Sequence, residues 1–506
     1  MLFLCLLVLL LVLLVIVSVK IRSKKLIELH RQIKVNFPYV PVIGHAYKFI
    51  GTNEDRMLMF DELGRQAHCN PYGLASFWLA HYLCVSISDP VCASAVLKTF
   101  SDKWPVTLSM RHLLGNGSVF AEAEIWRLRR KILIPVFNSK YCDNFVKVFE
   151  RNNEVLIEKL AAVVGQGDIS MWPFFSSYTL DSAFGMTFGE NVNAQKDPNH
   201  PFAKAFQDYF RNMAVRVCQP WLFSAALYEL LPAGRRQERN RRVLWDYLDD
   251  IITKKKRKIS AEKLENELEH HRQNTVNNNF KSFLDLLIEF SGGEDGYTDT
   301  ELREETIVLI LAATDTSATT LSIAAVLLAN HPRVQDKVYE ELQEVLGDSE
   351  RCLDNLAKLK YLDAVVKETL RLYPPAPVTV RRCDKDLELP SGLVLNNGCY
   401  FLLNFWSIHR NPHCWGADAD EFRPERFLSV TPQQLSAFMP FGHGPRSCTG
   451  FSLALTSIKL SLAETLRRFR VAPGAGYACG ARAPLRVTFD IMLKHVHNFE
   501  VQLERR

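Results

Sequence analysis

Apolar residues recur along most of this chain at the three- and four-residue spacing of amphipathic helices, from about residue 58 to residue 370. Short apolar and β-branched runs at residues 84–87, 393–394 and 486–489 predict strands instead. No internal repeat is visible. The pattern therefore predicts a mainly α protein with a small β region.

The N-terminal segment differs from the rest, because its first 19 residues are almost all apolar and carry no charge. As a helix this run would be about 28 Å long, enough to cross the hydrocarbon core of a bilayer. Lys20, Arg22, Lys24 and Lys25 follow at once, and positive charge keeps that side cytoplasmic. We predict a transmembrane signal-anchor at residues 1–19. A cleaved signal peptide is the alternative, although no A-x-A-like cleavage site is present.

Residues 20–45 are predicted to link the anchor to the remainder of the chain. They begin with the basic residues and include the pattern Pro38-x-x-Pro41-x-x-Gly44. Proline fixes φ and lacks an N–H, so this stretch is expected to be stiff and non-helical. Residues 46–506 then form one cytosolic domain.

Composition narrows the function classes. The 506 residues carry a net charge of +5, too weak a bias to indicate a nucleic-acid partner. A basic run at residues 254–258 is interpreted as a solvated helix end. The 12 cysteines never form C-x-x-C, which argues against a disulfide framework or a zinc module and favours free thiols in a reducing compartment.

One long helix is predicted from residue 299 to residue 330. Thr298 and Glu301 make a capping box at its start, and Asn330-His331-Pro332 ends it. Its ends are apolar but its centre is polar. If this helix were a second membrane span, Asp315 would lie at mid-bilayer and would cost about 2.5–3.5 kcal/mol. A core helix whose polar centre borders a cavity is the better interpretation.

The strongest chemical signal is the ten-residue sequence FGHGPRSCTG at residues 441–450. Its glycines let the backbone approach a flat cofactor, and amides around Cys448 stabilise a thiolate, the form that binds metal. Arg446 offers a fixed cationic fork for a carboxylate. Residues 451–469 read as a helix, which places Cys448 just before a positive dipole end. A thiolate-ligated haem accounts for every one of these elements.

This sequence resembles the signature F-x-x-G-x-R-x-C-x-G of the cytochrome P450 superfamily, from Phe441 to Gly450. The resemblance extends over nearly the whole chain, with further motifs in the expected order. It implies the cytochrome P450 fold and a haem b cofactor. It also implies that Cys448 is the proximal iron ligand, within a haem-thiolate catalytic domain at residues 46–506.

Two further motifs support the resemblance. Glu368-Thr369-Leu370-Arg371 resembles the family's E-x-x-R, and Arg426 lies in Pro424-Glu425-Arg426-Phe427, the family's P-E-R-F. Taken alone the first motif is most often a surface ion pair. The resemblance implies instead a buried structural triad of Glu368, Arg371 and Arg426.

The family's W-x-x-x-R motif places Trp126 and Arg130 against a haem propionate. Arg381, after the turn at Pro377, falls where the family has a further propionate arginine. A basic amphipathic helix accounts for the charges alone. The remaining basic residues of 126–131 are expected to face an acidic redox partner and to steer its association.

The centre of the long helix resembles the family's A-G-x-D-T-T. The resemblance implies that Thr316 hydrogen-bonds the activated dioxygen and that Asp315 relays protons from solvent. Ala313 replaces the usual glycine, and Ser317 replaces the second threonine. Back-bonding of Thr316 to the Ala312 carbonyl is the structural alternative.

Residues 126–137, WRLRRKILIPVF, are most similar to the microsomal fatty-acid ω-hydroxylase-like group and its insect relatives. Many members of that group carry, at the position of Ala312, a glutamate that can form a haem ester. Ala312 provides no carboxylate for such a bond.

The resemblance implies a monooxygenase that inserts one oxygen atom from O₂ into an apolar small molecule, such as a fatty acid, steroid, terpenoid or xenobiotic. NADPH-cytochrome P450 reductase would supply electrons, with cytochrome b5 as a second candidate donor, at the endoplasmic reticulum membrane. A haem-thiolate isomerase that rearranges a peroxide without a reductase, and a non-enzymatic membrane haem-binding protein, remain alternatives. The pocket walls are predicted at residues 104–120, 202–217, 309–316, 376–380 and 488–493.

Overall fold

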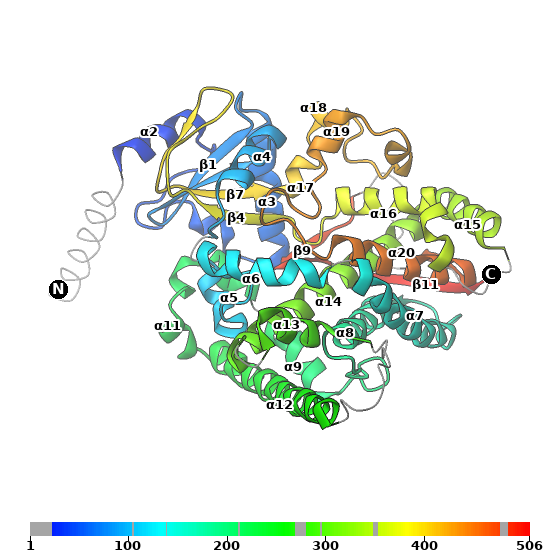
Figure 1. Ribbon diagram of the computed structural model, residues 1–506. Helices are drawn as coiled ribbons and strands as arrows, with labels where there is room; N and C mark the ends of the chain where they lie inside the picture. The colour runs from blue at the N-terminus through cyan, green and yellow to red at the C-terminus, as the bar shows by residue number, and fades with distance from the viewer. Residues whose placement is uncertain are drawn as a thin grey trace.

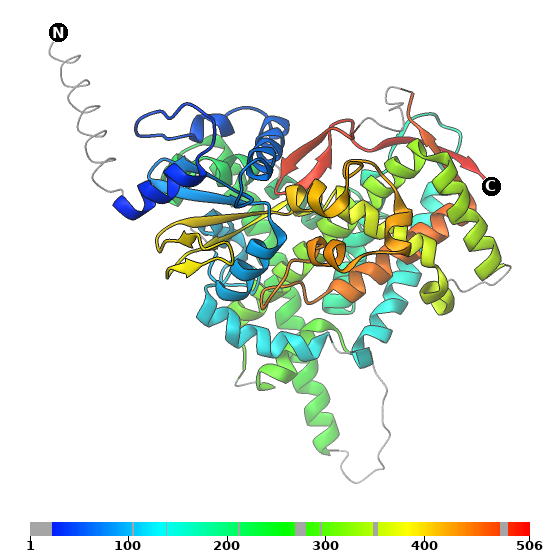
Figure 2. The same cartoon turned by 90° about the horizontal axis from the view of Figure 1, so that it is seen from above.

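The computed structural model describes residues 23–103, 106–137, 139–210, 213–268, 280–293, 296–347, 353–475 and 484–506. Helices make up most of it, the largest sheet lies at one end beside the N-terminal helices, and the C-terminal strand β11 runs toward the opposite end (Figures 1 and 2). The predicted mainly α architecture with a small β region is confirmed. The predicted anchor at residues 1–19 lies outside the described residues.

The α-helices are α2 (Lys24–Ile33), α3 (Asn53–His68), α4 (Pro90–Thr99), α5 (Val106–Leu114), α6 (Ala123–Val136), α7 (Ser139–Ala161), α8 (Trp172–Phe188), α9 (Pro201–Phe210), α10 (Met213–Cys218), α11 (Ala225–Glu229), α12 (Pro232–Leu268), α13 (Phe283–Ser291), α14 (Asp299–Asn330), α15 (Pro332–Leu346), α16 (Lys360–Leu372), α17 (Phe405–Ile408), α18 (Pro412–Trp415), α19 (Pro432–Ala437) and α20 (Phe451–Arg468). Short 3₁₀ turns are η1 (Ala46–Phe49), η2 (Pro220–Leu222), η4 (Leu353–Lys358) and η5 (Pro424–Leu428).

The strands are β1 (Leu74–Leu79), β2 (Tyr82–Ile87), β3 (Ile169–Ser170), β4 (Val378–Arg382), β5 (Leu387–Glu388), β6 (Val394–Leu395), β7 (Tyr400–Asn404), β8 (Phe469–Pro473), β9 (Val487–Asp490), β10 (Met492–His495) and β11 (Glu500–Arg505). The largest sheet has the order β1-β2-β7-β4, with β2 and β7 parallel and the other pairs antiparallel. Blue N-terminal and yellow C-terminal strands therefore lie side by side (Figure 1).

The folded body begins before the boundary predicted at residue 46. Residues 24–33, expected as part of a linker, form α2 and bury Leu29 and Ile33 in the hydrophobic cluster of the sheet region. The backbone then pairs with β1, because the Lys34 and Gly44 positions bridge to Ser76 and Leu79. Much of the predicted linker is therefore part of the domain.

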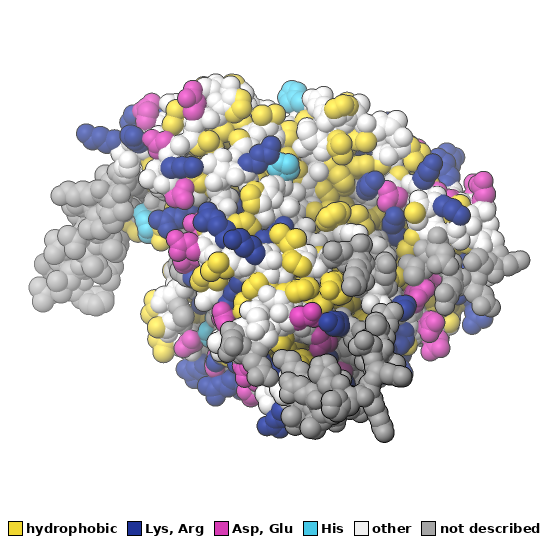
Figure 3. All heavy atoms as spheres, in the orientation of Figure 1, with side chains coloured by type: hydrophobic (Ala, Val, Ile, Leu, Met, Phe, Trp, Pro, Cys, Tyr) yellow, Lys and Arg dark blue, Asp and Glu magenta, His cyan; other side chains and the backbone are white. Residues whose placement is uncertain are grey.

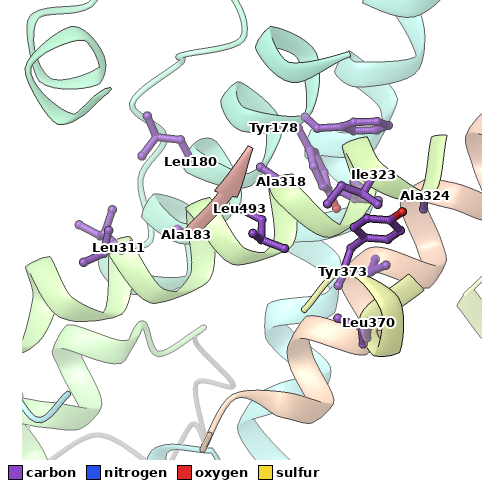
Figure 4. Packing of buried hydrophobic residues seen from close by; sticks show 14 of the residues in the cluster. Tyr178, Leu180, Ala183, Leu311, Ala318, Ile323, Ala324, Leu370, Tyr373 and Leu493 are labelled. Atoms are coloured by element: carbon purple, nitrogen blue, oxygen red, sulfur yellow. The ribbon is translucent and has the colours of Figure 1, made fainter. Parts of the chain in front are cut away.

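Helix α14 runs through the core of the molecule. The predicted capping box of Thr298 and Glu301 is present, and the helix ends at Asn330 as predicted. Its side chains pack between α8, α16 and α20, as Figure 4 shows for Ile323 of α14 and Tyr178 of α8. By length and apolar composition, α14 is the described helix that matches a membrane span, but most of that stretch is buried inside the protein.

The eight cysteines whose side chains the structure describes are all free thiols, in agreement with the sequence. The basic run at residues 254–258 lies inside α12 and not at its end. Three of its lysines pair with Asp250, Asp285 and Asp299, so these charges serve local ion pairs.

Candidate functional site

A cavity of about 350 Å³ lies between the polar centre of α14, the start of α20 and the loop that carries Cys448. It is walled by apolar side chains, with a few polar groups and cations at one side. Its apolar lining comprises Leu97, Val119, Leu133, Phe137, Phe149, Met186, Phe283, Val308, Leu309, Ala312, Ala313, Leu370, Pro375, Ala376, Phe405, Pro440, Phe441, Leu453, Ala454 and Ile458.

The Cys448 loop lies close to α4, because Gly444 has no side chain to separate them. Gly444 has φ +71°, and a Cβ on it would lie 2.6 Å from the Leu97 carbonyl oxygen. The Cys448 N–H donates to the Phe441 carbonyl at 2.9 Å, which closes the loop. Helix α20 starts directly after Gly450. The loop therefore presents the thiol at a fixed place, and its side chain is exposed to the cavity.

The electrostatics at Cys448 are balanced between opposing effects. Burial raises the pKa of the Cys448 thiol, while the Gly450 N–H and the nearby Arg130 guanidinium lower it. Arg130 is fixed in place because it donates to the Ser447 carbonyl at 2.8 Å. Metal coordination deprotonates a thiol outright, so these groups support a thiolate ligand.

Arg446 lies beside the predicted Trp126, with its guanidinium 4.3 Å from the centre of the indole ring. It donates to three backbone carbonyls, those of Ser101 at 3.1 Å, Ser118 at 3.0 Å and Ala121 at 2.6 Å. These carbonyls carry no full charge. Burial and the neighbouring Arg381 lower the pKa of Arg446 to about 9.

Two more cations line the same side of the cavity, Arg381 of β4 and Lys103. Arg381 donates to the Val380 carbonyl at 2.8 Å, but its buried Nε has no hydrogen-bond partner, and burial lowers its pKa to about 10. Lys103 donates to the Val119 carbonyl at 2.5 Å. Burial, together with Arg381 and Arg446, lowers the pKa of Lys103 well below its ordinary value.

These observations fit a haem. The described cavity lining holds the four cations Lys103, Arg130, Arg381 and Arg446 and includes no aspartate or glutamate. Buried charges need partners, and a flat apolar cofactor with two carboxylates would supply them next to a cysteine thiol. Cys448 would hold the iron, and these cations, with Trp126, would hold the propionates.

Thr316 and Asp315 face different cavities. Thr316 lines the Cys448 cavity, and its hydroxyl donates to the Ala312 carbonyl at 2.7 Å, which is the back-bonded arrangement. Asp315 borders a second cavity of about 260 Å³ and accepts from Lys494 at 2.6 Å. Thr316 was expected to hydrogen-bond the activated dioxygen and Asp315 to relay protons from solvent; the structure places Thr316 on the Cys448 cavity and Asp315 on the second cavity.

The structure brings the three residues of the predicted triad together. Glu368 accepts from Arg371 Nε at 2.7 Å and from Arg371 Nη2 at 2.8 Å. Arg426 Nε lies 3.3 Å from the same carboxylate. All three are buried, and Arg371 also donates to the carbonyls of His409 and Ala419 at 2.8 and 2.6 Å. The group ties α16 to the segment that precedes the Cys448 loop.

The expectation that the leftover basic residues of α6 face outward is wrong for Arg129. This side chain is buried and pairs with Glu304 at 2.7 Å and Glu305 at 3.1 Å, both on α14. Arg127 and Lys131 are exposed. On the face where α6 lies, basic and hydrophobic side chains are interspersed (Figure 3).

The segments that were predicted as pocket walls line more than one cavity. Parts of residues 104–120, 309–316 and 376–380 line the Cys448 cavity. Residues 202–217 and 488–493 contribute instead to the second cavity and to an adjoining apolar one of about 160 Å³. The adjoining cavity shares Lys103 and Thr379 with the Cys448 cavity, so the two are neighbours.

Sequence reasoning missed Lys103 and the pairing of Arg129 with α14. Lys103 stands in a short loop without a motif, so no local signal marks it. The pair Glu304-Glu305, directly before the apolar run at residues 307–313, was such a signal, because buried carboxylates require a cation.

Comparison with known proteins shows the family of this chain. The family model described as Cytochrome P450 matches residues 36–477. Cytochrome P450 4V2 of Mus musculus is 30% identical over 92% of this chain and 88% of its own length. Cytochrome P450 4F8 of Homo sapiens is 31% identical over 72% of this chain and 71% of its own. Cytochrome P450 4d2 of Drosophila melanogaster is 27% identical over 86% and 87%. The predicted likeness to insect and mammalian members of one group is thereby confirmed. The chain belongs to the cytochrome P450 family and is a monooxygenase with a thiolate-ligated haem that takes its electrons from a reductase system.

Proposed function

We propose that this protein inserts one oxygen atom from O₂ into an apolar small molecule, with electrons from NADPH delivered by NADPH-cytochrome P450 reductase. The observation that carries the proposal is the cavity itself, in which a thiol, a set of unneutralised cations and an apolar wall meet. Fatty acids, steroids, terpenoids and xenobiotics are the substrate classes that match this wall.

The chain's own residues divide the work at this site. When bound, the haem supplies an iron centre that activates O₂, and thiolate ligation favours cleavage of the O–O bond. Cys448 holds the iron, while Lys103, Arg130, Arg381 and Arg446 fix the carboxylates of the cofactor. The apolar walls exclude water and orient the substrate.

Thr316 is proposed as the group that holds a proton beside the reacting oxygen. Its hydroxyl donates to the Ala312 carbonyl, and a hydroxyl so held has two lone pairs left to accept a hydrogen bond. Rotation of the side chain would let the same hydroxyl donate into the cavity. Asp315 would act from the second cavity, after it leaves Lys494, rather than by direct contact.

The proposed electron donor docks on α6. Arg127 and Lys131 are exposed on this helix, while Arg130 of the same helix lines the cavity. An acidic reductase surface would be attracted to these charges. With the signal-anchor proposed at residues 1–19, both proteins would meet at the cytosolic face of the endoplasmic reticulum, with cytochrome b5 as a second donor.

The test is a reconstitution of the purified protein with the reductase. The reduced protein with carbon monoxide should show the red-shifted Soret band of thiolate ligation, and Cys448→Ser should abolish it. NADPH use with a hydroxylated product would support the monooxygenase. Peroxide rearrangement without NADPH would show an isomerase instead, and a normal band in Cys448→Ser would remove Cys448 as ligand.

The substrate class is tested separately by spectral shift. The purified haem protein is titrated with representative fatty acids, steroids, terpenoids and plant toxins. A ligand that displaces water at the iron shifts the Soret band, and the class with the tightest binding is taken into the reconstituted assay. No shift with any apolar class would contradict the proposed substrate chemistry.

A further inference from the structure

Glu305 is a buried carboxylate for which the proposed reaction gives no role. It lies on α14 with its side chain fully buried. Its Oε1 accepts from the Ser118 N–H at 2.9 Å and from Arg129 Nη1 at 3.1 Å, while Oε2 has no hydrogen-bond partner. Burial raises the pKa of Glu305, and Arg129 opposes this shift. Burying a carboxylate costs free energy, so we look for the role of Glu305 in the contacts that it makes.

Glu305 holds the middle of a backbone segment, residues 115–121, against α14. Gly115 has φ +51°, and a Cβ on it would lie 2.0 Å from Glu304 Oε1. A Cβ on Gly117 would lie 2.4 Å from Val308 Cγ2. Arg129 also donates to the Asn116 carbonyl at 2.7 Å. The segment is therefore packed on the helix with no space for side chains at two positions, and Glu305 fixes the Ser118 amide.

The opposite side of this segment holds the cations of the haem cavity. The Ser118 and Ala121 carbonyls accept from Arg446, and the Val119 carbonyl accepts from Lys103. Ser118 thus joins Glu305 to Arg446 through a single residue, by its N–H on one side and its carbonyl on the other.

We propose that Glu305 is a positioning residue for the cofactor. It anchors the Ser118 amide, and the segment 115–121 then aims Arg446 and Lys103 at the haem propionates. The inference rests on the proposed roles of these two cations. Glu304 differs, because its Oε2 pairs with Arg129 at 2.7 Å and it does not bond to the Ser118 amide.

This difference provides a matched control. Glu304→Ala removes one carboxylate from Arg129 but leaves the Ser118 amide anchored by Glu305. Glu305→Ala removes a carboxylate from the same arginine and also leaves the Ser118 N–H without its acceptor. Glu305→Gln keeps an acceptor oxygen at nearly the same place while removing the charge.

The experiment measures the rate at which each purified haem protein transfers its haem to apomyoglobin. The loss of one buried hydrogen bond to a charged group costs about 1.5–3 kcal/mol, so Glu305→Ala should release haem about tenfold or more faster. Glu304→Ala and Glu305→Gln should stay near the wild-type rate. Equal rates in Glu304→Ala and Glu305→Ala, or no rescue by Gln, would overturn the proposal in favour of a simple ion pair.

A second measurement applies if Glu305→Ala does not fold. Amide hydrogen exchange at residues 115–121 is compared in Glu305→Asp and Glu304→Asp haem proteins. The shorter side chain keeps the charge but withdraws the carboxylate, and only Glu305 accepts from the Ser118 N–H, so exchange at Ser118 should increase only in Glu305→Asp. Equal protection in both variants would overturn the role of Glu305. A wild-type protein that contains no haem would instead contradict the proposed function.

Discussion

Removal of Glu368 is expected to prevent accumulation of folded haem protein, although this residue does not line the cavity. The Glu368 carboxylate accepts two bonds from Arg371 and one from the Arg423 N–H at 2.9 Å, and it also pairs with Arg426. Glu368→Ala leaves two buried guanidinium groups without this carboxylate. Breaking one partner of a buried pair costs about 3–5 kcal/mol, which shifts the folding equilibrium more than about a hundredfold.

That loss is a large share of the about 5–15 kcal/mol by which domains are stable. The assay is haem content per polypeptide together with the thermal unfolding midpoint, for Glu368→Ala and Arg371→Ala. Lys337→Ala is the matched control, because it breaks an exposed pair with Glu425, the kind that contributes about 0–1 kcal/mol. Wild-type haem content and midpoint in both triad variants would refute the reasoning.

Three further predictions concern the cofactor, the oxygen site and pH. Acidic organic solvent should extract the haem, because Ala312 has no carboxylate for an ester; haem that stays on the denatured polypeptide would contradict this. Thr316→Ala should lower hydroxylated product per NADPH severalfold while hydrogen peroxide rises to match, and Thr316→Ser should preserve most coupling; unchanged coupling in Thr316→Ala would make the residue structural. Burial lowers the pKa of His409 to about 3. His409 therefore binds a proton more readily in the unfolded chain than in the folded one. Its contribution to the free energy of unfolding is full above about pH 6.5 and is lost as the pH falls, by about 2 kcal/mol between pH 7 and 5. Denaturant unfolding from pH 5 to 8 measures this slope, and the same slope in His409→Gln would assign it elsewhere.

Local signals in the sequence located the elements that carry the chemistry. The capping box at Thr298 and the proline after His331 bound α14 correctly, and the Cys448 motif with the helix after it appears where predicted. Each of these signals acts within a few residues, so the chain itself encodes them without reference to distant segments.

The sequence did not indicate features that depend on contacts between distant segments. The parallel pairing of β2 with β7 joins residues far apart in sequence, and only the folded chain brings Lys103 to the cavity beside Arg381 and Arg446. Neighbouring residues on a helix also diverge by about 100°. Thr316 and Asp315 therefore face separate cavities, a divergence that the motif alone could not reveal.

The cations that line the haem cavity repel one another, so the stability of the folded protein should depend on whether haem is bound. Burial lowers the pKa of Lys103, Arg381 and Arg446, and the neighbouring cations lower the pKa of Lys103 and of Arg446 further. The described lining offers no carboxylate to offset these charges. A ligand that binds only the folded state stabilises it by mass action, and here it would also remove charge repulsion. A cell that makes the polypeptide faster than it makes haem should therefore lose the excess to proteolysis, so the haem supply sets the steady-state level of the enzyme.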